Sequence, residues 1–181
     1  MKGMWNYFSY PFLFRKNKMK LRITSDWHLN FYKDEDSYSF LEKTDTDHEQ
    51  VLLLAGDILT KALVKNYRYH DLFIELDERF KKVYAILGNH EYYHSDINRV
   101  DQEMKEFFDE SFNNIHFGNN MTATIDGAKF IFSTLWTDVD HDTALFFRKK
   151  MSDFCVIKDG EEILHPEKTN TIHKQSVDFI Q

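Results

Sequence analysis

The sequence predicts an α/β fold in which helices cover a sheet that is buried on both faces. Strand-like runs occupy residues 20–25, 51–55 and 83–87, and the last two are almost wholly apolar. Short apolar runs of this kind are typical of strands covered on both faces. The 27 residues or so between the second and third runs mix apolar and charged positions at a length that suits a helical crossover between parallel strands.

The predicted elements follow one another in a simple order. Asp126-Gly127 has the composition of a two-residue hairpin turn, Pro166 suits the first turn of a last helix, and Ser95 or Asp96 suits a helix N-cap. We expect strands at 20–25, 51–55, 83–87, 114–117, 121–125 and 129–133, a helical crossover at 60–82, and helices after Ser95 or Asp96 and at 167–180. A polar surface loop, with a short helix at 38–43, fills the segment between the first two strands.

Each of the first three strands ends at a cluster of polar residues. In open α/β sheets, ligands bind outside the carboxyl ends of the strands, so the three clusters should lie close together. Carboxylate, amide and imidazole groups together suit Mn, Fe or Zn better than a metal that prefers thiolates. The candidate residues are Asp26 and His28, then Asp57, then Asn89, His90 and Glu91.

The chemistry available to these residues fits a phosphate ester. A carboxylate such as Asp57 can bridge two cations that clamp an in-line displacement at phosphorus. Gly56 and Gly88 permit a tight turn or a close approach of the backbone, and His90 can donate a hydrogen bond to phosphate or protonate the leaving oxygen. Taken singly, each cluster also has an ordinary interpretation as a chance pair, a turn or a helix cap.

Composition limits the other possibilities. The chain has 181 residues, which suits one domain, and a formal net charge of -7, which disfavours broad attraction to nucleic-acid backbones. Its single cysteine, Cys155, cannot form an internal disulfide, so we expect a cytoplasmic protein. Residues 1–18 are interpreted as an N-terminal extension that is too short to span a bilayer, and we expect no membrane span.

The motifs resemble those of the calcineurin-like metallophosphoesterase superfamily, in particular its small microbial and phage-type members. The family motifs read D-x-H, G-D and G-N-H-[DE], and the chain has DWH at 26–28, GD at 56–57 and GNHE at 88–91, in the same order. The segments STLWTD at 133–138 and MSDF at 151–154 are also similar to such members. The resemblance covers roughly residues 20–181.

This resemblance implies a fold and a division of roles. The fold would be an α/β sandwich of two mixed sheets flanked by helices, in a domain at 19–181, with a dinuclear metal centre of Mn, Fe, Zn or Ni. Asp26 and His28 would bind the first metal, Asp57 would bridge, and Asn89 would bind the second. His90 would contact the phosphate and assist the leaving group while a metal-activated water attacks, and Glu91 would orient His90 from behind.

The later ligands of the family, a histidine after a further strand and a G-H-x-H motif, have no counterpart in the sequence. The resemblance therefore implies a fold that is incomplete at its C-terminus and a second metal held only by Asp57 and Asn89. His141 lies among carboxylates in DVDHD, and we favour a solvated loop for it over a place in the site. A second polypeptide or a homo-oligomer would complete the sheet and the metal site.

Two functions from different classes remain open. The first is a metal-dependent phosphoester hydrolase acting on a phosphate-ester substrate. The second is a catalytically impaired binding or scaffold protein of the same fold, with an exposed sheet edge as a docking surface. An unrelated α/β domain with coincidental motifs is a third, weaker interpretation.

Overall fold

The computed structural model describes residues 19–31, 41, 43–45, 47–64 and 67–181. Two of the predicted features lie largely or wholly outside these residues: the N-terminal extension at 1–18 and most of the short helix at 38–43. Among the described residues, none forms a helix that is both long and apolar enough to cross a membrane.

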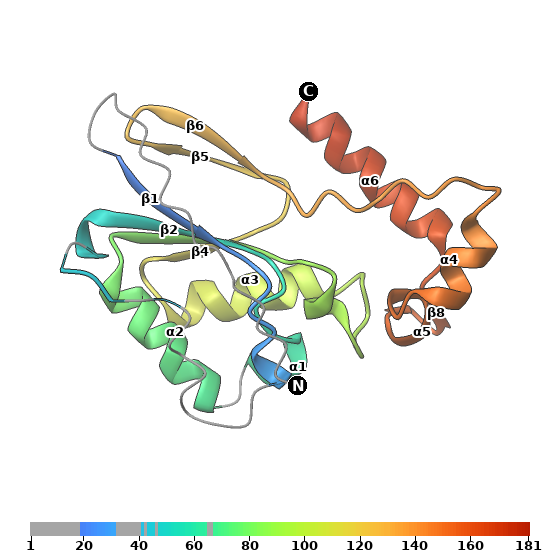
Figure 1. Cartoon of the computed structure of the whole chain (residues 1–181), viewed down its shortest axis with the longest axis horizontal. Coiled ribbons are helices and arrows are strands. Elements are labelled where there is room, and N and C mark those ends of the chain that lie inside the picture. The colour runs from blue at the N-terminus through green and yellow to red at the C-terminus, as the bar shows by residue number, and fades with distance from the viewer. Residues whose placement is uncertain (1–18, 32–40, 42, 46, 65–66) are drawn as a thin grey trace, which may run out of the picture.

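A parallel sheet forms the centre of the molecule (Figure 1). Its strands run in the order β1 (Lys20–Thr24), β2 (Gln50–Ala55), β3 (Lys82–Ile86) and β4 (Ile115–Phe117), and each neighbouring pair is parallel. The apolar runs predicted as strands are therefore confirmed. Because all four strands point the same way, the segments that follow them emerge at one edge of the sheet.

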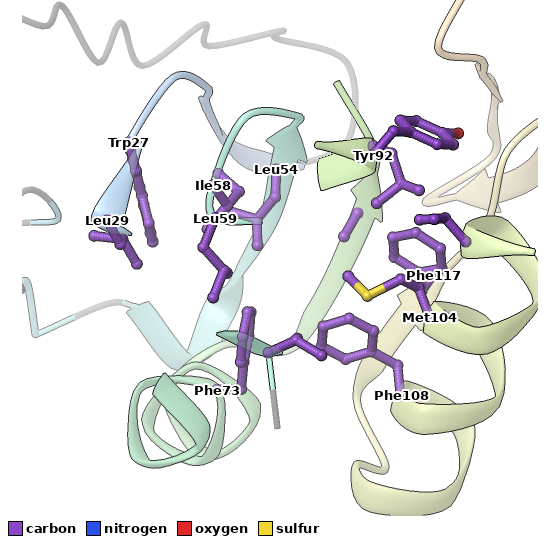
Figure 2. Packing of buried hydrophobic residues seen from close by; sticks show 14 of the residues in the cluster. Trp27, Leu29, Leu54, Ile58, Leu59, Phe73, Tyr92, Met104, Phe108 and Phe117 are labelled. Atoms are coloured by element: carbon purple, nitrogen blue, oxygen red, sulfur yellow. The ribbon is translucent and has the colours of Figure 1, made fainter. Parts of the chain in front are cut away.

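Helices cover one face of this sheet, below it in Figure 1. The crossover between β2 and β3 contains α1 (Lys61–Val64) and α2 (Tyr67–Arg79), and α3 (Val100–Ser111) connects β3 to β4. Figure 2 shows Phe73 of α2 and Met104 and Phe108 of α3 packed beneath the strands, in the main hydrophobic core. The predicted helical crossover is confirmed.

The start of α3 differs from the prediction. We expected Ser95 or Asp96 to cap it, but the helix begins at Val100. The Asp96 carboxylate instead accepts hydrogen bonds from the backbone N–H groups of Asn98, at 3.0 Å, and Gly160, at 3.3 Å. This carboxylate therefore stabilises a local turn and connects it to the backbone at Gly160, so it does not cap the helix.

An antiparallel hairpin covers part of the other face of the sheet (Figure 1). It consists of β5 (Met121–Ile125) and β6 (Ala128–Phe132). The turn residues Asp126 and Gly127 both have positive φ, 46° and 84°, as a two-residue hairpin turn requires. Ile125 and Phe132 pack against residues of the parallel sheet in a second core whose sheet members are Leu21, Val51, Leu53 and Tyr84.

The predicted α/β class with helices flanking more than one sheet is confirmed. Instead of each sheet mixing both strand directions, the described strands separate by direction. The central sheet is parallel, and the hairpins β5–β6 and β7–β8 are antiparallel.

The C-terminal segment lies to one side of the sheet (Figure 1). It contains α4 (Ala144–Lys150), α5 (Asp153–Val156), β7 (Lys158–Asp159), β8 (Glu162–Ile163) and α6 (Pro166–Ile180). Of these only α6 was predicted, and Pro166 stands in its first turn as expected. Phe154, Ile157 and Leu164 are buried in the main core, so they anchor this segment to the rest of the molecule.

Candidate metal centre

The loops that follow β1 and β2 are joined by backbone hydrogen bonds. The N–H of Asp26 donates to the carbonyl of Gly56 at 3.0 Å, and the N–H of His28 donates to the carbonyl of Asp57 at 2.9 Å. These bonds extend the contact between the parallel strands beyond the end of the sheet. The two loops are therefore held in a fixed register, and the predicted polar residues come together.

Trp27 anchors the loop after β1 in the core. Its side chain is 4% exposed and lies in the main core, as Figure 2 shows, and its indole N–H donates to Thr24 Oγ1 at 2.7 Å. The side chains on either side of it are more exposed, 54% at Asp26 and 25% at His28. The loop is therefore held by Trp27, while its two neighbours remain accessible.

Asp26, His28 and Asp57, three of the metal ligands that the sequence predicts, lie close together. Their candidate ligand atoms all lie within 4.8 Å of one another. All three have left-handed backbone conformations, with φ of 58°, 47° and 57°. Such conformations cost about 1–3 kcal/mol for residues other than glycine and concentrate at functional sites.

The spacing of this cluster fits a divalent cation. His28 Nε2 lies 3.8 Å from Asp26 Oδ1 and 3.9 Å from Asp57 Oδ2. These separations are long for hydrogen bonds, whereas ligands about 2.0–2.2 Å from a shared ion lie roughly 3–4 Å apart. His28 Nδ1 is also buried without a hydrogen-bond partner among the described residues. The donor set of two carboxylates and an imidazole suits such an ion.

Two glycines allow the loops after β2 and β3 to approach each other. A Cβ on Gly88 would lie 2.1 Å from Asp57 Oδ1, and a Cβ on Gly56, which has φ of +88°, would lie 2.4 Å from the Gly88 nitrogen. Any side chain at either position would therefore displace the candidate ligand or the neighbouring backbone. This contact confirms the close approach that was expected of the two glycines.

Asp57 lies at the centre of the cluster. Its Oδ1 accepts a hydrogen bond from the backbone N–H of His90 at 2.9 Å, while its Oδ2 faces His28. Burial raises the pKa of Asp57 above its ordinary value, against the opposing effects of the His90 hydrogen bond and the His28 ring. A cation here would favour the ionised carboxylate.

His90 lies beside this cluster, in a ring of aromatic side chains. It is 7% exposed, and the centroid of its ring is 4.6 Å from that of His28, 4.5 Å from that of Tyr93 and 5.4 Å from that of Phe31. Its Nε2 is 3.3 Å from Asn30 Nδ2. Burial, followed by repulsion from His28, lowers the pKa of His90, which favours the neutral ring.

Glu91 has a different position from the one expected. We predicted that it would orient His90, but its carboxylate, in a residue 2% exposed, accepts hydrogen bonds from backbone N–H groups of the two neighbouring loops. The donors are Asp57 at 3.0 Å, Ile58 at 2.6 Å, Leu59 at 3.2 Å and Gly88 at 2.8 Å. The described hydrogen bonds of Glu91 therefore join the loops after β2 and β3, in place of the contact with His90 that was expected.

The same surroundings affect the ionisation of Glu91. Burial and the nearby charge of Asp57 raise its pKa to about 7, against the opposing effect of the backbone hydrogen bonds. The ionised form is the one that can accept from all four donors.

Asn89 contacts two residues that the sequence did not single out for the site. Its Nδ2 donates to Asp153 Oδ1 at 2.8 Å and lies 3.3 Å from the Tyr93 hydroxyl oxygen. Asp153 belongs to α5, in the MSDF segment, and is 4% exposed. Sequence reasoning missed Asn30, Phe31, Tyr93 and Asp153 as neighbours of the site. The MSDF segment, which contains Asp153, was the available sequence signal for that residue.

A pocket of about 560 Å³ lies next to Asn89. The segment 134–140, which overlaps the STLWTD motif at 133–138, lines one wall, and its Thr134 hydroxyl donates to the carbonyl of Leu87 at 2.9 Å. Phe147, Met151 and Phe154 contribute apolar side chains, so the pocket extends from the site towards the C-terminal segment.

His141 lies outside the site. Its side chain is 99% exposed and its Nδ1 is 3.6 Å from the equally exposed Asp142. The preferred interpretation of this histidine as part of a solvated loop is confirmed.

The chain is similar to known proteins in sequence and in fold. An uncharacterized protein of Acanthamoeba polyphaga mimivirus is 29% identical over 177 residues, which cover 88% of this chain and 61% of that protein. The crystal structure of the phosphopantetheinyl hydrolase of Mycobacterium tuberculosis has a similar fold, with a TM-score of 0.56 and 18% identity, over 88% of this chain and 60% of that one. The chain thus spans about three fifths of the length of both. The family profile "calcineurin-like phosphoesterase" matches residues 19–173, and the chain belongs to this family.

Proposed function

We propose that the protein is a metal-dependent phosphoester hydrolase that uses a metal-activated water for in-line attack on phosphorus. The observation that carries the proposal is the cluster of Asp26, His28 and Asp57 beside the buried His90 at the carboxyl ends of the parallel strands. Membership of the calcineurin-like phosphoesterase family supports the same reaction class.

The chain's own residues divide the work. Asp26, His28 and Asp57 would hold a first cation, and Asp57 and Asn89 would hold a second. When bound, such ions would activate water at neutral pH and stabilise the charge that develops on the phosphoryl group. Mn, Fe, Zn and Ni are the candidates, because the ligand set is made of oxygen and nitrogen atoms.

His90 and Asn89 form the substrate-facing side of this proposed site. The neutral His90 ring offers one donor and one acceptor, and binding of an anionic phosphate beside it would favour protonation. His90 then donates a hydrogen bond to the phosphate or a proton to the leaving oxygen. Glu91 contributes by holding the Asp57 and Gly88 loops together, through its hydrogen bonds to their backbone.

A second polypeptide or a second copy of the chain completes the second metal site in this proposal. Asp57 and Asn89 alone offer that cation only two protein ligands. A single exposed cysteine, Cys155, fits the reducing conditions of the cytoplasm, where we place the protein.

This shortage of ligands also favours a second candidate function. A chain that binds one cation without turnover would act as a phosphate-binding or scaffold protein of the same fold. The two functions make different predictions for hydrolysis and for metal content.

Metal binding and hydrolysis by the purified chain test the proposal. We expect bound Mn²⁺ and hydrolysis of a generic aryl phosphodiester or phosphomonoester. A phosphopantetheinyl ester joins the panel because the structural neighbour is named for it. Asp57→Asn should remove bound metal, and His90→Ala should slow hydrolysis at least about 100-fold while metal stays bound. Asp142→Asn, at a side chain 97% exposed, is the matched control and should change neither property.

The outcomes separate the candidates. Turnover that survives in both Asp57→Asn and His90→Ala would place the chemistry elsewhere. Metal binding that requires Asp57, without hydrolysis of any ester in the panel, would favour the binding protein. A wild-type chain that binds none of the four metals contradicts the metal centre itself.

A further inference from the structure

Asp153 brings a buried carboxylate from the C-terminal segment to the edge of the candidate metal centre. It opens α5 and is 4% exposed. The next residue, Phe154, is 5% exposed, and Ile157 is fully buried, so the helix that carries Asp153 is anchored in the main core. The carboxylate is therefore held in place by packing that is independent of the site.

Two neutral groups donate hydrogen bonds to this carboxylate. Its Oδ1 accepts from Asn89 Nδ2 at 2.8 Å, and its Oδ2 accepts from the Tyr93 hydroxyl at 3.4 Å. Burying a carboxylate costs several kcal/mol unless hydrogen bonds or nearby positive charge compensate. A cation on the far side of Asn89 would supply that compensation without touching Asp153.

The hydrogen bonds also fix the orientation of the Asn89 amide. Asn89 Nδ2 donates to Asp153 and lies 3.3 Å from the Tyr93 hydroxyl oxygen, so both of its hydrogens have acceptors. An ionised carboxylate only accepts hydrogen bonds. The amide nitrogen must therefore face Asp153, which leaves the Asn89 oxygen as the atom that can meet a cation.

We propose that Asp153 is a positioning residue that holds the Asn89 amide with its oxygen towards the second cation. The inference rests on the proposed function for the ligand role of Asn89, but the hydrogen bond itself does not depend on metal. Without Asp153, the amide can rotate by half a turn and present its nitrogen, which repels a cation.

Metal titration with a double-mutant cycle tests the effect on the cation. In the full chain, Asp153→Ala should weaken the weaker of two Mn²⁺ binding events about 10- to 100-fold, the effect of losing a group that supports a ligand. The tighter event, at Asp26 and His28, should change less than about twofold. In an Asn89→Ala background, Asp153→Ala should add little, because its target is gone.

The conservative variant separates positioning from a general structural role. Asp153→Asn keeps an oxygen that accepts from Asn89 and should recover part of the affinity. If Asp153→Ala does not fold, Asp153→Asn with and without Asn89→Ala gives the same cycle. A general loss of structure would instead weaken both Mn²⁺ events together.

The side-chain amide signals of Asn89 in an NMR spectrum of the metal-free protein give a second readout. We identify them by their loss in Asn89→Ala and expect them to shift in Asp153→Ala. Asp142→Asn, at an exposed carboxylate, should leave them in place. This readout does not require bound metal.

The results distinguish this inference from the proposed function. Unshifted Asn89 signals in Asp153→Ala overturn the inference, as does an equal loss of Mn²⁺ affinity in the presence and absence of Asn89. Asn89 signals that shift in Asp153→Ala, together with a wild-type chain that binds none of the four candidate metals, would support the Asp153–Asn89 contact and contradict the proposed function.

Discussion

The loops after β1, β2 and β3 differ from the C-terminal segment in how firmly they are held. Backbone hydrogen bonds join the loops to one another, and a single buried carboxylate, that of Glu91, binds four of their N–H groups. In α4, by contrast, no residue is buried, and Leu145 and Phe146 are 69% and 61% exposed. The candidate metal centre lies where hydrogen bonds join the backbones of neighbouring loops. The C-terminal segment contacts this centre through a few buried residues.

This comparison explains how strained residues can persist in the site. Asp26, His28 and Asp57 all have positive φ, and each would relax if its loop were free. The hydrogen bonds between loops hold these three residues in their strained conformations, and the stability of the surrounding structure offsets the conformational free energy that the strain costs. Removing those bonds should therefore affect both stability and metal binding.

Removal of the Glu91 carboxylate is expected to have the largest effect. Glu91→Ala leaves four backbone donors without their acceptor, two of them in fully buried hydrogen bonds. Unsatisfied buried donors are costly, so we expect a loss of about 3–5 kcal/mol in the free energy of unfolding. Urea denaturation measures it. Glu161→Ala, at an exposed position between β7 and β8, is the matched control in the C-terminal segment and should change stability by less than about 0.5 kcal/mol.

Glu91→Gln sharpens this prediction. The side chain keeps its size and one of its two acceptor oxygens. The loss in the free energy of unfolding should therefore be smaller than for Glu91→Ala. A loss below about 1 kcal/mol for Glu91→Ala would mean that the loops hold without the carboxylate, and the comparison between the two regions would fail.

Replacement of Gly88 or Gly127 by alanine should lower the free energy of unfolding by a smaller amount, which depends on where the glycine lies. Gly88→Ala puts a Cβ 2.1 Å from Asp57 Oδ1, and we expect a loss of about 1–3 kcal/mol from overpacking together with weaker Mn²⁺ binding. Gly127→Ala, in the β5–β6 turn with φ of +84°, meets nothing within 4 Å. It should cost about 1 kcal/mol from backbone strain alone.

Urea denaturation and Mn²⁺ titration of both variants separate crowding from strain. Gly127→Ala should retain wild-type Mn²⁺ affinity because it lies in the hairpin turn, away from the candidate ligands. Equal Mn²⁺ affinity in the two variants would show that the close approach at Gly88 does not shape the site.

The features that the sequence revealed are those encoded by neighbouring residues. Apolar runs indicated the strands, Asp126-Gly127 indicated the hairpin, and the polar residues after each strand indicated the site. All of these signals act over a few positions, where side-chain alternation and turn preference are decided.

The features that it did not reveal depend on distant partners. Glu91 lies 32–34 positions from three of its four donors, and Asp153 lies 64 positions from Asn89. The start of α3 was misplaced because Asp96 is used by Asn98 and Gly160. The helix α4 was missed because two of its apolar residues, Leu145 and Phe146, are exposed, so the apolar spacing does not indicate a core-facing side.

The smallest expected effect concerns Leu135, in the wall of the pocket beside Asn89. It is 46% exposed and has φ of 48°, a conformation that favours glycine. Leu135→Gly relieves that strain but makes the unfolded chain more flexible, so we expect a gain of about 0.5 kcal/mol. Leu145→Gly, at an exposed helical position in α4, should instead lose about 1 kcal/mol. Thermal or urea denaturation of the pair would show opposite signs for the same substitution at two exposed leucines. A loss in both would mean that Leu135 contributes packing that outweighs its strain. A gain in stability together with slower hydrolysis in Leu135→Gly would instead show that the strained Leu135 side chain contributes to substrate turnover at the pocket.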